Sequence, residues 1–154
     1  MLPDDGQIVT ESAAMTLLLA ELAASTALVA APGEAERAAF LRWLIFLVAA
    51  IYPAFSYADV PTRFVPEAEA AGFRARVGAL KEENWRLVEA EATRRGGPWF
   101  LGARMTALDI YIMVMVHWTP REDWFRAEAP HLTAIAARAT ALPAFAPVMQ
   151  RNFG

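Results

Sequence analysis

Thr106 and Asp109 stand three residues apart where the most apolar segment of the chain begins. In this order Thr106 can be a helix N-cap whose hydroxyl accepts the backbone N–H of Asp109, while the Asp109 carboxylate accepts the N–H of Thr106. Met105 and Ile110 flank the pair as a hydrophobic staple would. Residues 107–118 are apolar on every side and predict a buried central helix. We therefore expect Thr106 and Asp109 to form a structural capping box.

Helical periodicity extends through the rest of the chain. Pro32-Gly33 predicts a linker over 25–33, and we place the domain boundary there. We expect Pro53 to end or kink the second helix, with an aromatic loop over 52–66 and a partly irregular segment over 121–129. The elements expected are a short strand at Gln7–Val9 and helices at Ser12 to about Ala24, Glu34–Phe55, Glu67–Arg95, Pro130–Ala141 and Pro143 to about Phe153.

Composition narrows the class of protein. The 154 residues fit one domain, and a hydrophobic content of 56% favours a helical globule with a large core. The formal net charge of −3, a single Lys and dispersed Arg argue against nucleic acid as a partner. Cysteine is absent, which excludes a thiol nucleophile and a Cys metal site. His117 and His131 lack the spacing of a zinc site, so we expect no metal.

No secretory signal peptide is evident in the sequence, and we expect a cytoplasmic protein. Asp4 and Asp5 stand where a secretory signal would carry positive charge. The apolar run over 41–55 is interrupted by Arg42 and Pro53, and we interpret it as a buried helix too short to cross a bilayer. We therefore expect no membrane association.

Two segments together resemble the glutathione transferase family. Glu11-Ser12 opens a helix after a strand-like stretch, and Gly102-Ala-Arg-Met-Thr106-Ala-Leu-Asp109 matches the family's Gly-x-x-x-Ser/Thr-x-x-Asp box. The order and separation of the two motifs fit the family, and the resemblance covers nearly all of the chain. It implies an all-α helical bundle of the C-terminal glutathione transferase type, preceded by a short strand and helix of a thioredoxin-like domain.

The resemblance also implies a domain division. Residues 1–27 would be the end of the glutathione-binding domain and residues 34–154 the helical domain. The family's catalytic Tyr, Ser or Cys lies near the first strand of the thioredoxin-like domain. No residue of this sequence matches it, so we expect no catalytic residue within the chain.

Glu11 and Ser12 are the strongest ligand candidates. Ser12 stands at a helix N-terminus, where free N–H groups and the helix dipole favour an anion, and Glu11 could pair with an ammonium group. The resemblance implies that they hold the γ-glutamyl end of glutathione. The alternative is an ordinary Ser N-cap beside a Glu favoured by the dipole.

An aromatic cluster is the second candidate. The resemblance places Tyr52, Phe55 and Tyr57 at the pocket for the hydrophobic co-substrate, and Trp118 and His117 could border it. Apolar and aromatic linings with a few polar tips are common in small-molecule pockets. Ordinary core packing is the alternative for each of these residues.

Two readings of function follow. In the first, the protein conjugates the glutathione thiolate to a hydrophobic electrophile once its N-terminal domain is present, as in detoxification. In the second, it is a catalytically inactive binding or assembly module of the same type. The family also dimerises, so the resemblance implies a homodimer in either case.

Overall fold

The fold is all-α over the part of the chain that the structure, a computed structural model, describes, namely residue 6 and residues 8–154. The fold class expected from the sequence is confirmed. The expected strand is not formed at Ile8 and Val9, which are described, whereas Gln7 lies outside the described residues. A strand needs a neighbour to receive its backbone hydrogen bonds.

The helices are α1 (Ser12–Leu22), α2 (Arg37–Phe46), η1 (Leu47–Ile51), α3 (Tyr52–Asp59), η2 (Pro61–Arg63), η3 (Glu67–Glu69), α4 (Ala70–Arg95), α5 (Ala107–Met115), α6 (Glu122–Glu128), α7 (Pro130–Thr140) and α8 (Ala146–Phe153).

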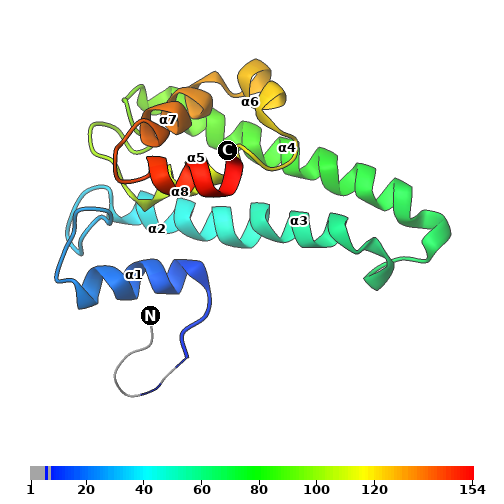
Figure 1. The fold of residues 1–154 in the computed structure, drawn as a ribbon, viewed down its shortest axis with the longest axis horizontal. Helices are drawn as coiled ribbons and strands as arrows, with labels where there is room; N and C mark the ends of the chain where they lie inside the picture. The colour runs from blue at the N-terminus through cyan, green and yellow to red at the C-terminus, as the bar shows by residue number, and fades with distance from the viewer. Residues whose placement is uncertain (1–5, 7) are drawn as a thin grey trace.

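The long helices set the shape of the molecule. Figure 1 shows α2, η1 and α3 as one continuous rod, with α4 returning beside it and α1 lying along the opposite side. Helix α5 occupies the middle and packs against α7 and α2, while α6 packs on α7. The core around α5 is closed by large buried side chains that include Phe40, Trp85, Phe100, Leu108 and Ile112.

The linker between α1 and α2 is fastened to the start of α5. The backbone N–H of Ala107 donates to the carbonyl of Leu28 at 2.7 Å, and Arg104 donates to the carbonyl of Thr26 at 2.7 Å. These bonds supply partners for backbone groups that the helix end and the loop would otherwise leave open. They also fix α1 relative to α5, and the two helices then enclose the candidate site.

The segment around Pro53 differs from the prediction. The chain continues as helix to Asp59 instead of entering a loop, because residues 47–51 form one wide π turn. In this turn the N–H of Tyr52 donates to the carbonyl of Leu47, five residues back. Pro53 then falls in the first turn of α3, where its missing N–H leaves no helical bond broken.

Because the helix continues past Pro53, it is longer than the apolar run considered in the sequence analysis. The helical stretch Arg37–Asp59 spans 23 residues and is long and apolar enough to cross a bilayer by length and composition alone. The run over 41–55 was expected to be too short to cross a bilayer, but it is part of this longer helix, because Pro53 does not interrupt the helix. Only 33% of its most apolar window is buried inside the structure. Buried residues such as Leu44 and Leu47 nevertheless anchor one side of it in the core.

Helix α6 is the other segment that the sequence analysis described incompletely. Residues 121–129 were expected to be partly irregular, yet Glu122–Glu128 is helical. Glu122 and Asp123 stand in the first turn, where their charge favours the helix dipole, and Phe125 is buried. Periodicity predicts a helix only where several apolar residues recur at helical spacing, and this segment has a single buried aromatic residue.

Candidate functional site

The capping box lies at the centre of the fold. Asp109 is fully buried, and its Oδ2 accepts the backbone N–H of Thr106 at 2.7 Å and the Thr106 hydroxyl at 3.2 Å. Its Oδ1 accepts the N–H of Phe100 at 2.8 Å. Burial raises the pKa of Asp109, and the hydrogen bonds from Phe100 and Thr106 oppose that rise. Every contact of this carboxylate is therefore to backbone or cap, which is a structural role.

A cavity of 630 Å³ opens between α1 and α5 and reaches the η1–α3 rod. Its volume is typical of small-molecule pockets. Four residues singled out in the sequence lie around this single space: Glu11, Ser12, Tyr52 and Trp118. The remaining lining residues are Met15, Thr16, Leu19, Val48, Ala107, Ile110, Tyr111, Val114 and Met115.

Glu11 has an unusual backbone conformation at the mouth of the cavity. Its φ of 64° lies in the left-handed region, which a residue with a side chain seldom adopts. This conformation turns the chain sharply into α1, so that Ser12 begins the helix without a side-chain cap. Strained backbone of this kind is concentrated at ligand-binding and catalytic sites.

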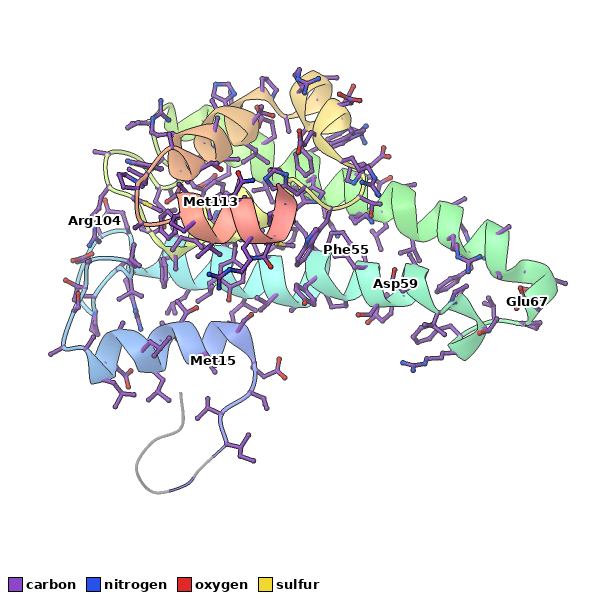
Figure 2. All side chains as sticks on the ribbon, in the orientation of Figure 1. Met15, Phe55, Asp59, Glu67, Arg104 and Met113 are labelled. Atoms are coloured by element: carbon purple, nitrogen blue, oxygen red, sulfur yellow. The ribbon has the colours of Figure 1, made fainter. Side chains whose placement is uncertain are left out.

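The N-terminus of α1 brings Ser12 to the edge of this cavity. Within the described residues, no acceptor is found for the N–H groups of Ser12, Ala13 and Ala14, whereas the N–H of Met15 donates to the carbonyl of Glu11. Free N–H groups at a helix start favour an anionic ligand. Figure 2 shows Met15 on α1, the helix that presents these donors.

Two aromatic rings line the opposite side of the cavity, and a third ring supports them from behind. Tyr52 packs edge-on against Trp118 with ring centroids 5.5 Å apart, and both rings line the cavity. Phe55 lies behind them, 5.1 Å from Trp118 and 6.3 Å from Tyr52, and is not part of the lining. Tyr57 lies outside this group, because its ring packs on Phe64 at 5.1 Å. We call Tyr52, Phe55 and Trp118 the aromatic wall.

Thr16 and Tyr111 are lining residues that sequence reasoning did not select. Their hydroxyl oxygens lie 3.5 Å apart, across the space between α1 and α5. Thr16 lies one turn after Ser12, so helical spacing from that residue could have found it. Tyr111 follows Asp109 by two residues, and no local pattern distinguishes it from a core residue.

Charge is sparse around the cavity. Glu11 is the only charged side chain among the described lining residues, and no Lys, Arg or His belongs to that lining. The polar groups are otherwise hydroxyls, from Ser12, Thr16, Tyr52 and Tyr111. An anionic ligand must therefore rely on hydroxyls and the free N–H groups of α1. An uncharged hydrophobic ligand meets no such restriction.

His117 faces a different region. Its Nδ1 lies 2.6 Å from Glu122, its ring stacks on Phe153 at 4.4 Å, and it lines a second cavity of 400 Å³ against α6 and α7. The suggestion that His117 borders the same pocket as Trp118 does not hold. In residue 6 and residues 8–154, no group of three His, Asp or Glu side chains is arranged to hold a metal ion.

Comparison with known proteins gives one curated relative and many solved structures. No family model matches the chain. The relative is an uncharacterized GST-like protein of Escherichia coli strain K12, 32% identical over 149 residues, which cover 97% of this chain and 70% of that protein. Two solved structures illustrate the structural likeness.

The first solved structure is a glutathione transferase homologue from Sulfitobacter with bound glutathione, with a TM-score of 0.82 and 22% identity, covering 99% of this chain and 72% of that one. The second is a glutathione transferase from Methylococcus capsulatus strain Bath, with a TM-score of 0.78 and 26% identity, covering 97% and 70% of the two chains. The arrangement of α1 to α8 therefore recurs in these proteins.

Proposed function

The chain belongs to the glutathione transferase family, and on that premise we propose that the cavity between α1 and α5 binds glutathione beside a hydrophobic electrophile. One observation carries this proposal. Ser12 borders the same cavity as Tyr52 and Trp118, and its backbone N–H has no acceptor among the described residues. In this proposal a site for a charged amino-acid terminus would adjoin a site for an apolar molecule.

The glutathione half of the site follows from charge. The γ-glutamyl end of glutathione carries a carboxylate and an ammonium group on one carbon. The carboxylate would accept hydrogen bonds from the Ser12 hydroxyl and the free N–H groups of α1. The ammonium would pair with the carboxylate of Glu11, the one charged side chain of the described lining. Since Glu11 is exposed, we expect this ion pair to contribute little by itself.

The electrophile would lie against the aromatic wall. In the conjugation, the glutathione sulfur forms a bond to an electrophilic carbon. The leaving group departs with its bonding electrons, and the thiol proton passes to solvent. Bringing both molecules into one cavity supplies the positioning part of the rate gain. Thiol activation is expected from the family's thioredoxin-like domain.

Within this proposal the chain has two parts. Residues 1–27 belong to the glutathione-binding domain, and residues 34–154 form the helical domain that holds the electrophile. The packing of α1 supports the division, because Ala13 is the one residue of that helix that is buried. The linker bonds at Thr26 and Leu28 join the two parts.

A non-catalytic binding module is the second candidate. The observation in its favour is that the described lining contains no cation that could stabilise a thiolate. The α1 N-terminus and the hydroxyls are the groups left for that task. A protein of this kind would bind glutathione conjugates without forming them.

We further propose a homodimer. Ile45 on α2 and Leu80 and Leu87 on α4 are each more than half exposed, and large apolar side chains of this kind are common at subunit interfaces. Light scattering at micromolar concentration tests this proposal, and a monomer would contradict it.

Calorimetric titration with glutathione tests the binding proposal. We expect binding by the chain and roughly tenfold weaker binding by Ser12→Ala, which loses one charge-assisted hydrogen bond. Ser56→Ala is the matched control, because Ser56 is exposed on α3 and does not line the cavity. Absence of binding by the unmodified chain, or equal affinities for the Ser12 and Ser56 variants, would contradict the proposal.

A further inference from the structure

Lys81, the one lysine of the sequence, is buried on the inner side of α4. Only 3% of the residue is exposed. Its Nζ donates a hydrogen bond to the Thr119 hydroxyl and lies 4.3 Å from the centre of the Phe55 ring. No carboxylate of the described residues forms an ion pair with it. The ammonium group is thus held by an aromatic face and a neutral hydroxyl.

Both groups held by Lys81 belong to the aromatic wall or adjoin it. Phe55 is the rear ring of the wall and contacts Trp118 and Tyr52 edge-on. Thr119 directly follows Trp118 in the chain. Lys81 therefore fixes the wall at two points, one on α3 and one after the end of α5. Figure 2 shows Phe55 on α3.

Packing alone does not account for the ammonium group. A methionine has a similar length and would fill the space beneath Phe55 without desolvating a charge. Burial lowers the pKa of Lys81, while the charges of Asp59 and Glu82 oppose that change. The cation differs from an apolar side chain because it orients its two neighbours, Phe55 and Thr119. It attracts the face of Phe55 and donates to one oxygen, whereas an apolar side chain would leave both groups free to shift.

We propose that Lys81 is a positioning residue that holds Tyr52, Phe55 and Trp118 in the shape that accepts a flat, uncharged aromatic group. This inference rests on the proposed function, because the aromatic group is the hydrophobic substrate or its glutathione conjugate. Lys81 acts through Phe55 and Thr119 and does not line the cavity itself.

The ligand class follows from the lining. The mutually edge-on rings of Tyr52 and Trp118 suit a planar ring, since aromatic pairs favour offset-stacked and edge-to-face arrangements. The described lining offers no Lys, Arg or His to pair with an acidic group at this end of the cavity. A neutral aryl group therefore fits better than an aryl carboxylate or sulfonate.

The test compares two probes by calorimetry: glutathione and S-(2,4-dinitrophenyl)glutathione. The dissociation constant of glutathione divided by that of the conjugate measures how much the aryl group contributes to affinity. We expect Lys81→Met to reduce that ratio roughly threefold to tenfold, with the affinity for glutathione itself unchanged. Lys81→Arg keeps the charge and should restore most of the ratio.

Arg86→Met is the matched control. Arg86 also lies on α4 and also stacks over an aromatic ring, but the ring is Trp124, which does not line the cavity. This variant removes the same charge and should leave the ratio unchanged. An equal loss in the Arg86 and Lys81 variants would overturn the inference.

Two outcomes separate the inference from the proposed function. If Lys81→Met binds both probes as the unmodified chain does, the inference fails and the proposed function stands. If the unmodified chain binds neither probe, the proposed function fails, and near-ultraviolet circular dichroism then decides the inference. We expect that spectrum to change in Lys81→Met while the far-ultraviolet spectrum does not. Unchanged spectra in both regions would overturn the inference.

Discussion

The backbone N–H of Phe100 donates a buried hydrogen bond of 2.8 Å to Oδ1 of Asp109. This bond extends the capping box beyond the helix that it caps. One oxygen of the carboxylate holds the start of α5 through Thr106, and the other holds the preceding loop. The same box orients Tyr111, Val114 and Met115, which follow on α5 and line the cavity.

Asp109→Ala should be strongly destabilising. It leaves the N–H groups of Phe100 and Thr106 buried without an acceptor, and we expect a loss of roughly 2–4 kcal/mol in the free energy of unfolding. Urea denaturation measures this loss. Asp123→Ala is the control, because the Asp123 side chain is 95% exposed, and it should change stability by less than about 0.5 kcal/mol. Similar midpoints for the two variants would contradict the role given to Asp109.

Glu89 performs the same task for α7 from a distant part of the chain. Its carboxylate on α4 accepts the backbone N–H groups of His131 and Leu132 at 3.1 and 3.0 Å, at the start of α7. Glu89→Gln keeps the shape and removes half of the acceptor capacity, so we expect a loss of about 1–2 kcal/mol. Hydrogen exchange should show the first turn of α7 opening more often. Exchange faster in α1 alone would point to a different cause.

These two carboxylates show which parts of the fold the sequence could predict. Thr106 and Asp109 are three residues apart, so local spacing identifies their hydrogen bonds. Glu89 and Leu132 are 43 residues apart, and no local pattern links them. The effect of Pro53 was missed for a related reason. A proline normally ends a helix, and the π turn that accommodates it is visible only in the backbone.

The candidate site was predictable to a similar extent. Glu11 and Ser12 could be proposed because a helix start is a local feature with known chemistry. Tyr52 and Trp118 could be proposed only through the family resemblance, since their spacing suits core packing equally well. Tyr111 and Thr16 meet across two helices, and the pairing of those helices depends on the whole bundle. The role proposed for Lys81 depends on its burial, and burial could not be predicted from the sequence because lysine is almost always exposed.

The pH dependence of Glu91 gives a third prediction. Hydrogen bonds from Arg94 and then Arg95 lower the pKa of Glu91 to about 2. A lowered carboxyl pKa adds stability above the ordinary value of 4.5, and this contribution is lost as the pH falls from 4.5 towards 2. We expect Glu91→Gln to lose about 1 kcal/mol at pH 7, because the Arg94 side chain is 66% exposed and solvent weakens the pair.

Unfolding of Glu91→Gln and the unmodified chain should be compared from pH 7 down to pH 3. The difference between their free energies of unfolding should be constant above about pH 5 and should narrow below that pH. Glu83→Gln, an exposed change on the same helix, is the control. A gap that stays constant down to pH 3 would mean that the two arginines do not hold Glu91 ionised.

Filling the cavity gives a fourth prediction. Val114 lines the space between α1 and α5, so Val114→Trp places an indole ring where the ligand would lie. We expect binding of S-(2,4-dinitrophenyl)glutathione to weaken roughly tenfold or more. Val148→Trp on α8 is the control, because Val148 is 54% exposed and outside the lining. Equal binding by the two variants would place the ligand elsewhere.

Lys81→Met also makes a prediction about stability. Burial lowers the pKa of Lys81, while Asp59 on α3 and Glu82 on α4 partly oppose the change. A lysine whose folded-state pKa lies below its ordinary value of 10.5 destabilises the fold while it is charged, and this penalty disappears as the pH rises through the folded-state pKa towards 10.5. We expect the variant to equal the unmodified chain at pH 7 or to exceed it by about 1 kcal/mol.

Urea denaturation at pH 7 and pH 10 measures both parts of this last prediction. The advantage of Lys81→Met should shrink at pH 10, because the cost of burying the Lys81 charge decreases as the pH approaches the ordinary pKa of 10.5. Arg86→Met should show no such change, since an arginine stays charged over this range. A Lys81→Met protein that is less stable at pH 7 by a margin independent of pH would mean that the ammonium group supports the fold. The positioning role would then lose its physical basis, because stability alone would account for the buried charge.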